Sequence, residues 1–251
     1  MDERKVVLIT GGAMGQGRAH AYKYAENGFD VVLADMQEPT SDSFKETIAH
    51  CESIGAKVLA VKANITSTED MENLFKRAWD TFGRIDVVIA NAGVINFAYT
   101  WELTDEQVEK VISINLIGTW RTDKYAAQYM LKQGVGRIIN ISSTNGINTY
   151  YPMCIDYDAS KAALISLTHN LAFEYGPYIN VNAIAPGFIG TDNELDGYDE
   201  EFLKEEQEKI MVNRYGKPEE VAYLVKFLIS DEANFINNTI IRIDGGQKGS
   251  C

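Results

Sequence analysis

The sequence predicts an α/β fold with a doubly wound parallel sheet of about seven strands and helices on both faces. Short β-branched runs alternate with longer helical patterns along most of the 251 residues, as expected for repeated βα units. The short runs are continuously apolar rather than alternating, which is typical of parallel strands covered on both faces. No internal repeat and no proline-rich linker divides the sequence. One domain spanning residues 1–251 is therefore expected.

The expected strands are Lys5–Thr10, Asp30–Asp35, Lys57–Lys62, Asp86–Asn91, Gly136–Ser142, Ile179–Pro186 and Thr239–Asp244. Amphipathic segments lie between them, and segment 66–83 shows the helix boundaries most clearly. It opens with hydroxyl residues that can cap a helix and with early acids, and it ends at Gly83. Repeated βα units of this kind indicate a Rossmann-like sheet.

The composition narrows the function. The chain is 45% hydrophobic and 24% charged, as in ordinary globular proteins, and its net charge of −13 disfavours binding to nucleic acid. The N-terminal sequence shows no signal peptide, and no apolar stretch approaches the roughly 20 residues that span a bilayer. Three scattered cysteines and three scattered histidines suggest reduced thiols and no metal site. We therefore expect a cytoplasmic protein without a metal, acting on a small molecule.

A glycine-rich turn follows the first expected strand. Gly11, Gly15 and Gly17 form the pattern T-G-x-x-x-G-x-G, with Met14 and Gln16 between them. At such a turn a phosphate meets the free N–H groups and the positive end of a helix. Glycine is favoured because a Cβ would block the close approach of the backbone to a pyrophosphate. The loop is predicted to bind a dinucleotide.

Asp35 ends the second expected strand, 18 residues after Gly17. A carboxylate there can accept both ribose hydroxyls of an adenosine and repel a 2′-phosphate. No basic residue follows it in "ADMQEP", where Met36 comes next. The alternative is that Asp35 only caps the following turn. The sequence favours NAD over NADP.

Tyr157 and Lys161 lie four residues apart in "IDYDASKAAL". On a helix this spacing puts both side chains on one face, so a phenol lies beside an ammonium. Such a pair does not by itself indicate a function, so the rest of the chain must supply a site in which it could act.

With T-G-x-x-x-G-x-G, Asn91-Ala92-Gly93 and Tyr157-x-x-x-Lys161 in this order, the chain resembles the short-chain dehydrogenases/reductases. Further matches are "ISINLIG", "NISSTNG", "APGFIGT" and "RYGKPEEVA", so the resemblance covers essentially the whole chain. It implies a catalytic set of Asn115, Ser143, Tyr157 and Lys161, with Ser143 preferred to its neighbour Ser142. Asn115 is implied to hold a water next to Lys161.

The resemblance also implies further binding residues and a substrate lid at about 188–212. Asn64 stands where the family usually has an aspartate near the adenine. The acidic part of the lid is expected to be a solvated helix face. The cofactor residues are Gly11, Met14, Gly15, Gln16, Gly17, Asp35, Met36, Asn64, Ile65, Asn91, Ala92, Gly93, Tyr157, Lys161, Pro186, Gly187, Ile189 and Thr191, and the substrate residues are Ser143, Asn145, Tyr151, Tyr157 and Phe188.

The chemistry expected of Tyr157 and Lys161 depends on the pKa of the phenol. A free phenol has a pKa of about 10, so lowering it by three units takes roughly 4 kcal/mol of preferential phenolate stabilisation. The Lys161 ammonium, acting as a fixed cation, and the oxidised nicotinamide would supply it. Ser143 would donate to the carbonyl oxygen as charge develops there.

The leading hypothesis is an NAD-dependent oxidoreductase that interconverts a secondary alcohol and its ketone. An aromatic loop before Tyr157 suggests a bulky, weakly polar substrate such as a hydroxysteroid. Sugar alcohols and 3-oxoacyl thioesters are the alternatives, and a non-enzymatic dinucleotide-binding scaffold is a third. The family resemblance also implies a homotetramer that pairs long helices over Thr104–Gln133 and Tyr157–Tyr175.

Overall fold

The computed structural model describes residues 4–148, 152–191 and 199–248. In this part of the chain, parallel strands form one sheet in the order β3-β2-β1-β4-β5-β6-β7, which confirms the predicted fold class. The strands are β1 (Val6–Thr10), β2 (Asp30–Asp35), β3 (Val58–Lys62), β4 (Val87–Ala90), β5 (Gly136–Ile141), β6 (Ile179–Pro186) and β7 (Ile240–Ile243). Each lies within its predicted segment. The first four residues of β1 and all of β4 are buried apolar residues, because helices cover both faces.

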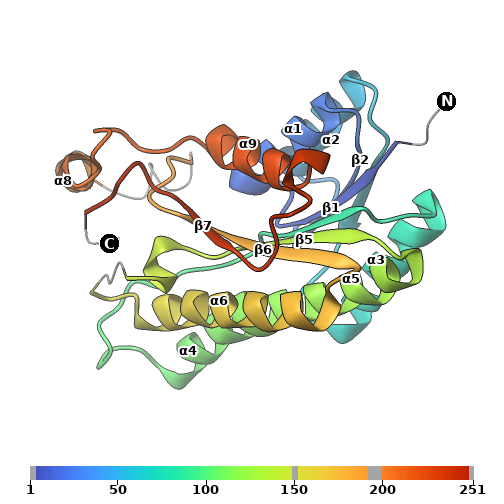
Figure 1. Ribbon diagram of the computed structural model, residues 1–251. Coiled ribbons are helices and arrows are strands. Elements are labelled where there is room, and N and C mark those ends of the chain that lie inside the picture. Colours follow the sequence, from blue (N-terminus) through green and yellow to red (C-terminus); the bar gives the residue numbers. More distant parts are fainter. Residues whose placement is uncertain (1–3, 149–151, 192–198, 249–251) are drawn as a thin grey trace.

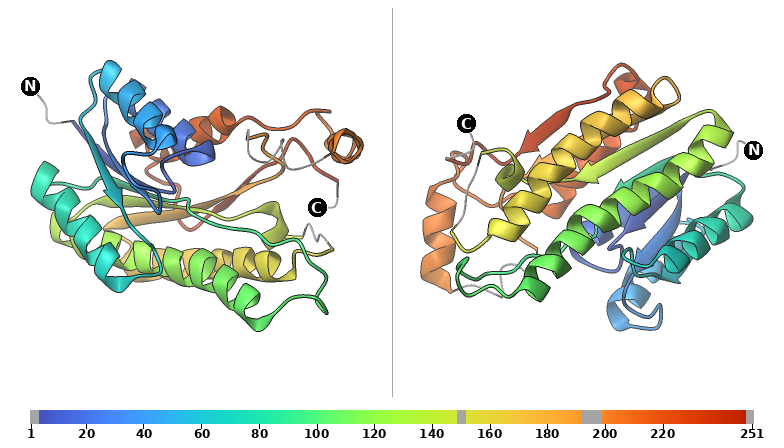
Figure 2. Two further views of the ribbon diagram at one scale, coloured as in Figure 1. Left: turned by 180° about the vertical axis from the view of Figure 1, so that it is seen from behind. Right: turned by 90° about the horizontal axis from the view of Figure 1, so that it is seen from below.

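Helices form a layer on each side of the sheet (Figure 1). One layer consists of α1 (Gly15–Glu26), α2 (Asp42–Ser53) and α9 (Pro218–Leu228). The opposite layer consists of α3 (Thr68–Phe82), α4 (Asp105–Ile112), α5 (Thr119–Gln133) and α6 (Ile155–Tyr175). Two views from behind and below show α5 and α6 side by side under the sheet (Figure 2). Each layer buries its own apolar cluster against the sheet.

Local signals fix the helix ends where the sequence indicated them. The Ser67 hydroxyl accepts a hydrogen bond from the Asp70 N–H at the start of α3, and Gly83 ends the helix in the left-handed conformation. The long helix expected over Thr104–Gln133 is helical throughout but not uniform. A π-helical segment, Ser113–Gly118, separates α4 from α5.

Apolar side chains on the outer surfaces of α5 and α6 are exposed. Trp120 is 42% exposed and Phe173 is 80% exposed. The homotetramer, which would bury such faces, stays a prediction.

A buried polar group lies between α5, β5 and α6. The Asn140 amide donates to Asp123 Oδ2 at 3.1 Å and to Thr168 Oγ1 at 3.1 Å. Asp123 Oδ1 and Asn140 Oδ1 have no partner among the described residues. Burial raises the pKa of the Asp123 carboxyl well above its ordinary value, because the charged form is desolvated.

Asp123→Asn should remove the free-energy cost of burying an ionised carboxylate, a cost that grows with pH. Because the pKa is raised in the folded state, the contribution of the Asp123 carboxyl to stability is greatest below its unfolded pKa of about 4 and is lost as pH rises towards the folded value. The difference in free energy of unfolding between variant and wild type should therefore increase with pH. Urea titrations at several pH values measure it, and a difference that does not change with pH would contradict an elevated Asp123 pKa.

Candidate active site

A groove of about 840 Å³ crosses the carboxyl ends of β1, β2 and β4. It lies where the strand order reverses, between β1 and β4, which is where doubly wound sheets bind ligands. Most residues predicted to bind the cofactor line it: Gly11, Met14, Gly15, Gln16, Asp35, Met36, Asn64, Ile65, Asn91, Ala92, Gly93 and Thr191. Pro186 and Gly187 line a smaller cavity of about 180 Å³, which Gln16, Asn91 and Gly93 also line.

Two predicted cofactor residues have packing contacts within the protein. A Cβ on Gly17 would lie 1.9 Å from the Gly11 carbonyl oxygen, so glycine is required here for the start of α1 to pack on the loop. Ile189 is 2% exposed and belongs to the apolar cluster around α1, α2 and α9. Neither residue lines the groove or the smaller cavity.

Asp35 both caps a turn and faces the groove. Its Oδ1 accepts a hydrogen bond from the Gln37 N–H at 3.1 Å, and its Oδ2 accepts one from the Ala13 N–H at 3.2 Å. The bonds orient the carboxylate, and each oxygen keeps a further lone pair. The neighbouring groove residues Ala34 and Met36 carry no charge.

Asn64 uses its acceptor within the protein. Its Oδ1 accepts from the Thr66 N–H at 3.0 Å and from the Thr66 hydroxyl at 2.8 Å. The Asn64 backbone N–H donates to Asp70 Oδ2 at 2.8 Å, so the side chain and the backbone of Asn64 are both held from within the protein. The amide nitrogen is the part of Asn64 left to face a ligand.

Lys161 is buried on the inner face of α6. Its Nζ donates to the Ile141 carbonyl oxygen at 2.8 Å and lies 5.5 Å from the centroid of the Tyr157 ring. Burial lowers the pKa of the ammonium from 10.5 to about 8. Lys161 is thus still a cation at neutral pH, held near the Tyr157 ring as expected.

The smaller cavity brings Ser143, Tyr157 and Lys161 together. Ser143 is held at the end of β5, where its Oγ accepts from the Asn145 N–H at 3.2 Å. The neighbouring Ser142 hydroxyl is buried and donates to the Lys161 carbonyl oxygen at 2.8 Å. That bond ties β5 to α6, and it leaves Ser143 as the serine whose hydroxyl is placed for substrate.

Asn115 lies in the π-helical segment. Its Oδ1 accepts from the Val94 N–H at 2.8 Å, and its amide donates to the Val94 carbonyl at 2.8 Å and to the Ser160 hydroxyl at 3.0 Å. A Cβ on Gly93 would lie 3.3 Å from Asn115 Oδ1 and 3.4 Å from Lys161 Nζ. Asn115 and Lys161 therefore both approach Gly93, and the role of Asn115 in holding a water stays a prediction.

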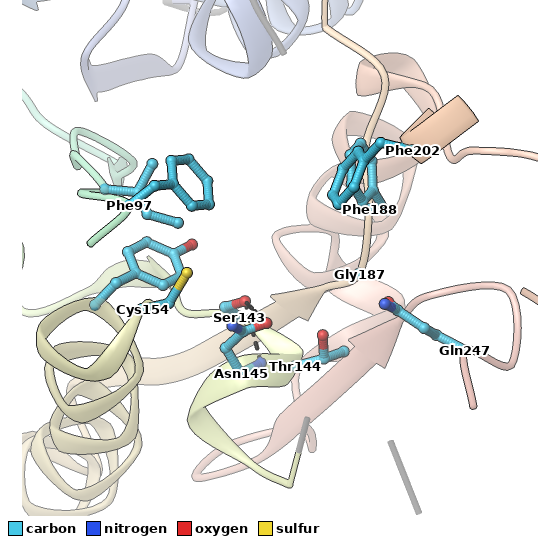
Figure 3. A pocket seen from close by; sticks show the side chains of 11 residues that line it. Phe97, Ser143, Thr144, Asn145, Cys154, Gly187, Phe188, Phe202 and Gln247 are labelled. Atoms are coloured by element: carbon cyan, nitrogen blue, oxygen red, sulfur yellow. Dashed lines mark hydrogen bonds between the residues drawn. The ribbon is translucent and has the colours of Figure 1, made fainter. Parts of the chain in front are cut away.

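Tyr157 also lines a further pocket, the aromatic pocket. Phe97 lies on one side of this pocket, and Phe188 and Phe202 lie on the other (Figure 3). Its lining consists of Ile95, Phe97, Ser143, Thr144, Asn145, Cys154, Tyr157, Gly187, Phe188, Phe202 and Gln247. Ser143, Tyr157 and Gly187 also line the smaller cavity, so the two spaces meet at these residues.

Comparisons with known proteins agree with this geometry. A family model described as enoyl-(acyl carrier protein) reductase matches residues 11–248. An uncharacterized oxidoreductase of Thermotoga maritima is 37% identical over 249 residues, covering 97% of each chain.

The chain belongs to the short-chain dehydrogenase/reductase family. It is also similar to a 3-oxoacyl-(acyl-carrier-protein) reductase of Thermotoga maritima, with 36% identity over 97% of this chain and 98% of that one. A levodione reductase of Leifsonia aquatica is 36% identical over 98% of this chain and 95% of that one. The crystal structure of a levodione reductase superposes with a TM-score of 0.88 at 35% identity, covering 97% of each chain. Members of the family bind a nicotinamide dinucleotide.

The groove of this short-chain dehydrogenase/reductase fits such a cofactor. Asp35 and the smaller cavity beside Tyr157 mark its two ends, and Gln16 lines both spaces. Gln16 Oε1 is buried and has no partner among the described residues, so it is available to a ligand in the groove. Residues 4–148, 152–191 and 199–248 contain no group of three metal-binding side chains and no helix that could span a membrane.

The substrate residues were predicted only in part. Ser143, Tyr157 and Phe188 line the pocket as expected, whereas Tyr151 lies outside the described residues. Asn145 also lines the pocket; its amide donates to Asp158 Oδ1 at 2.6 Å, and its backbone N–H donates to Ser143 Oγ. Ile95, Phe97, Phe202 and Gln247 were not predicted as substrate residues. Phe202 lies within the expected lid segment, and Ile95 and Phe97 follow "NAG" by two and four residues, whereas Gln247 had no local signal.

The segment at about 188–212, which was expected to form a substrate lid, contains α8 (Glu200–Glu208), and its residues 192–198 lie outside the described part. Phe202 of α8 lines the pocket. The prediction that the charges of this segment are solvated is wrong at Glu206, which is 2% exposed and forms an ion pair with Lys209.

Proposed function

We propose that the protein is an NAD(H)-dependent oxidoreductase that interconverts a secondary alcohol and its ketone, with a bulky, weakly polar substrate. One observation carries the proposal. Tyr157 and Ser143 line both the cavity that continues the cofactor groove and the aromatic pocket. A proton donor and a hydrogen-bond donor therefore stand where a substrate carbon in the pocket would meet a bound nicotinamide.

The side chains have separate tasks in ketone reduction. The Ser143 hydroxyl donates to the substrate oxygen as negative charge develops on it. The Tyr157 hydroxyl gives its proton to the same oxygen, and the nearby Lys161 ammonium stabilises the phenolate that remains. The bound nicotinamide supplies the hydride. In alcohol oxidation the Tyr157 phenolate takes the alcohol proton.

The substrate proposal rests on the pocket walls. Phe97, Phe188 and Phe202 offer aromatic faces to an apolar body, which favours a hydroxysteroid-like molecule over a sugar alcohol. The similarity to a 3-oxoacyl-(acyl-carrier-protein) reductase favours 3-oxoacyl thioesters as a second candidate. The net charge of −13 speaks against that candidate, because acyl carrier proteins are acidic too.

A substrate panel tests the proposal. NADH absorbance is followed with cyclic ketones, a hydroxysteroid, a sugar alcohol and acetoacetyl-CoA, in both directions. Turnover of the cyclic ketones and the matching alcohols is expected. Turnover of acetoacetyl-CoA alone would establish the second candidate, and binding of NADH without turnover of any member would contradict an oxidoreductase of this kind.

Asp35 is expected to set the preference for NAD. Wild type should use NAD at least about 100-fold better than NADP by kcat/KM, because hydrogen bonds to a charged group contribute about 1.5–3 kcal/mol and the 2′-phosphate is repelled as well. Asp35→Ala should narrow the ratio by at least about tenfold. Glu38→Ala is a matched control, since Glu38 pairs with Lys62 and does not line the groove. Similar kcat/KM values for both cofactors in wild type would contradict the assignment.

A further inference from the structure

The aromatic pocket contains one buried polar group without a partner. Gln247 is 5% exposed, and its Oε1 has no hydrogen-bond partner among the described residues. The amide of Asn145, the other amide that lines the pocket, is used within the protein, by Asp158. An unpaired buried amide oxygen is unfavourable, and in native proteins it usually has a ligand or water partner. The free end of Gln247 therefore points to a ligand.

The position of Gln247 is fixed by the chain around it. After β7 the segment turns at Gly245 and Gly246 and runs back along the residues that follow α8. The Lys248 N–H donates to the Lys209 carbonyl at 2.8 Å, and Gln247 pairs with Ile210 as an isolated antiparallel bridge. Gln247 is held by this pairing, which also joins the end of the lid to the C-terminal segment.

The amide lies close to the chain where the two cavities meet. A Cβ on Gly187 would be 2.6 Å from Asp244 Cβ and 2.8 Å from Gln247 Oε1, so the amide oxygen packs directly against this glycine. Gly187 lines both the smaller cavity and the aromatic pocket. In the close view, Gln247 points into the pocket from the side opposite Phe97, towards Ser143 and Asn145 (Figure 3).

We propose that Gln247 determines substrate specificity by hydrogen bonding to a second oxygen of the substrate, one that does not react. This rests on the proposed function of the same site. The substrate class is a hydroxyketone with an apolar body, or the corresponding diol. The aromatic rings contact the body, Ser143 and Tyr157 bind the reacting oxygen, and Gln247 accepts a hydrogen bond from the remote hydroxyl.

A hydroxyl is favoured because the unpartnered atom of Gln247 is an acceptor. An amide that turns over by 180° presents its N–H₂ group instead and would bind a second carbonyl. Diones are therefore weaker relatives of the same class. A methyl group of similar size offers neither a donor nor an acceptor and would leave the amide unpaired.

The test compares matched ketones in one enzyme preparation. The probes are 4-hydroxycyclohexanone against 4-methylcyclohexanone, and hydroxy- against methyl-substituted decalones of longer span. In wild type, kcat/KM for the better hydroxy ketone should exceed that of its methyl partner by at least about tenfold, because a site built for a hydrogen bond rejects an analogue that lacks it. Since the result is a ratio within one preparation, the fraction of folded enzyme cancels.

The variants assign the effect to Gln247. Gln247→Met keeps the length of the side chain without hydrogen bonding, and it should bring the ratio close to one by slowing the hydroxy ketone alone. Gln247→Glu keeps an acceptor and should keep most of the preference. Gln207→Met is the control, because the Gln207 amide donates to the Asn213 carbonyl and Gln207 does not line the pocket.

The possible results distinguish a failure of the specificity proposal from a failure of the proposed oxidoreductase function. Equal kcat/KM values for hydroxy and methyl ketones in wild type would overturn the specificity proposal and leave the oxidoreductase intact. A preference that survives in Gln247→Met, or a proportional loss on both substrates, would overturn the role of Gln247. If wild type turned over no ketone with either cofactor, the proposed function itself would fail, and the specificity proposal with it.

Discussion

Replacing Tyr157 with Phe is expected to lower kcat by at least about 100-fold, because a positioned general acid–base group commonly contributes 10²–10⁴-fold. The change removes one hydroxyl and keeps the ring, so packing between the smaller cavity and the aromatic pocket is preserved. The affinity for NADH should stay within about threefold, since the phenol acts on the substrate oxygen. Steady-state kinetics on a good ketone and NADH fluorescence titrations measure the two quantities.

A matched control is available in the loop after β4. Tyr99→Phe makes the same chemical change in a side chain that is 42% exposed and stacks on Trp101. It should leave kcat unchanged. If the Tyr157→Phe enzyme bound NADH normally and kept more than about a tenth of wild-type kcat, general acid–base catalysis of the expected size would not reside at Tyr157.

Lys161→Met should reduce both turnover and cofactor affinity. It removes the ammonium near the Tyr157 ring, so a phenolate there loses its stabilising cation and kcat should fall by about 100-fold or more. The family resemblance also gives Lys161 a ribose contact, so the dissociation constant of NADH should rise by about tenfold, the usual effect of losing a charge-assisted hydrogen bond. Tyr157→Phe should show no comparable loss of affinity.

Loss of activity in Lys161→Met should not come from unfolding. The pKa of the buried ammonium is lowered from 10.5 to about 8, so its burial costs stability as pH falls through this interval, about 3 kcal/mol once pH is below 8. Removing the charge recovers that cost, although the bond to the Ile141 carbonyl is lost. Thermal melts at pH 7 should therefore show a folded variant. An enzyme that kept wild-type kcat would contradict the role of Lys161.

The fold was predictable because its signals are local. Each strand is a short apolar run, and the ends of α3 follow from Ser67 and Gly83 alone. The π-helical segment around Asn115 was not predictable, because an i→i+5 pattern has no simple residue signature. Local sequence patterns therefore predicted the order of the helices and strands. They did not predict the π-helical segment that contains Asn115.

Part of the site was predictable because the residues of the sequence motifs follow the carboxyl ends of parallel strands, which all lie at one edge of the sheet. The features that could not be predicted depend on contacts made only in the folded chain. The Gly11 carbonyl oxygen leaves no room for a Cβ at Gly17, and Glu206 is buried where the helical charge pattern indicated solvent. Gln247 enters the pocket because the C-terminal segment pairs with the residues after α8, which no local pattern reveals.

The pH dependence of alcohol oxidation in wild type and Tyr157→Phe tests the central claim most directly. With NAD and a secondary alcohol, kcat/KM of wild type should rise with pH and level off at an apparent pKa well below the value of about 10 for a free phenol. This pKa belongs to the coupled pair of Tyr157 and Lys161. The small residual rate of Tyr157→Phe should lack this rise. A rise with the same apparent pKa in the variant would show that another group takes the alcohol proton, and it would contradict the account of this site.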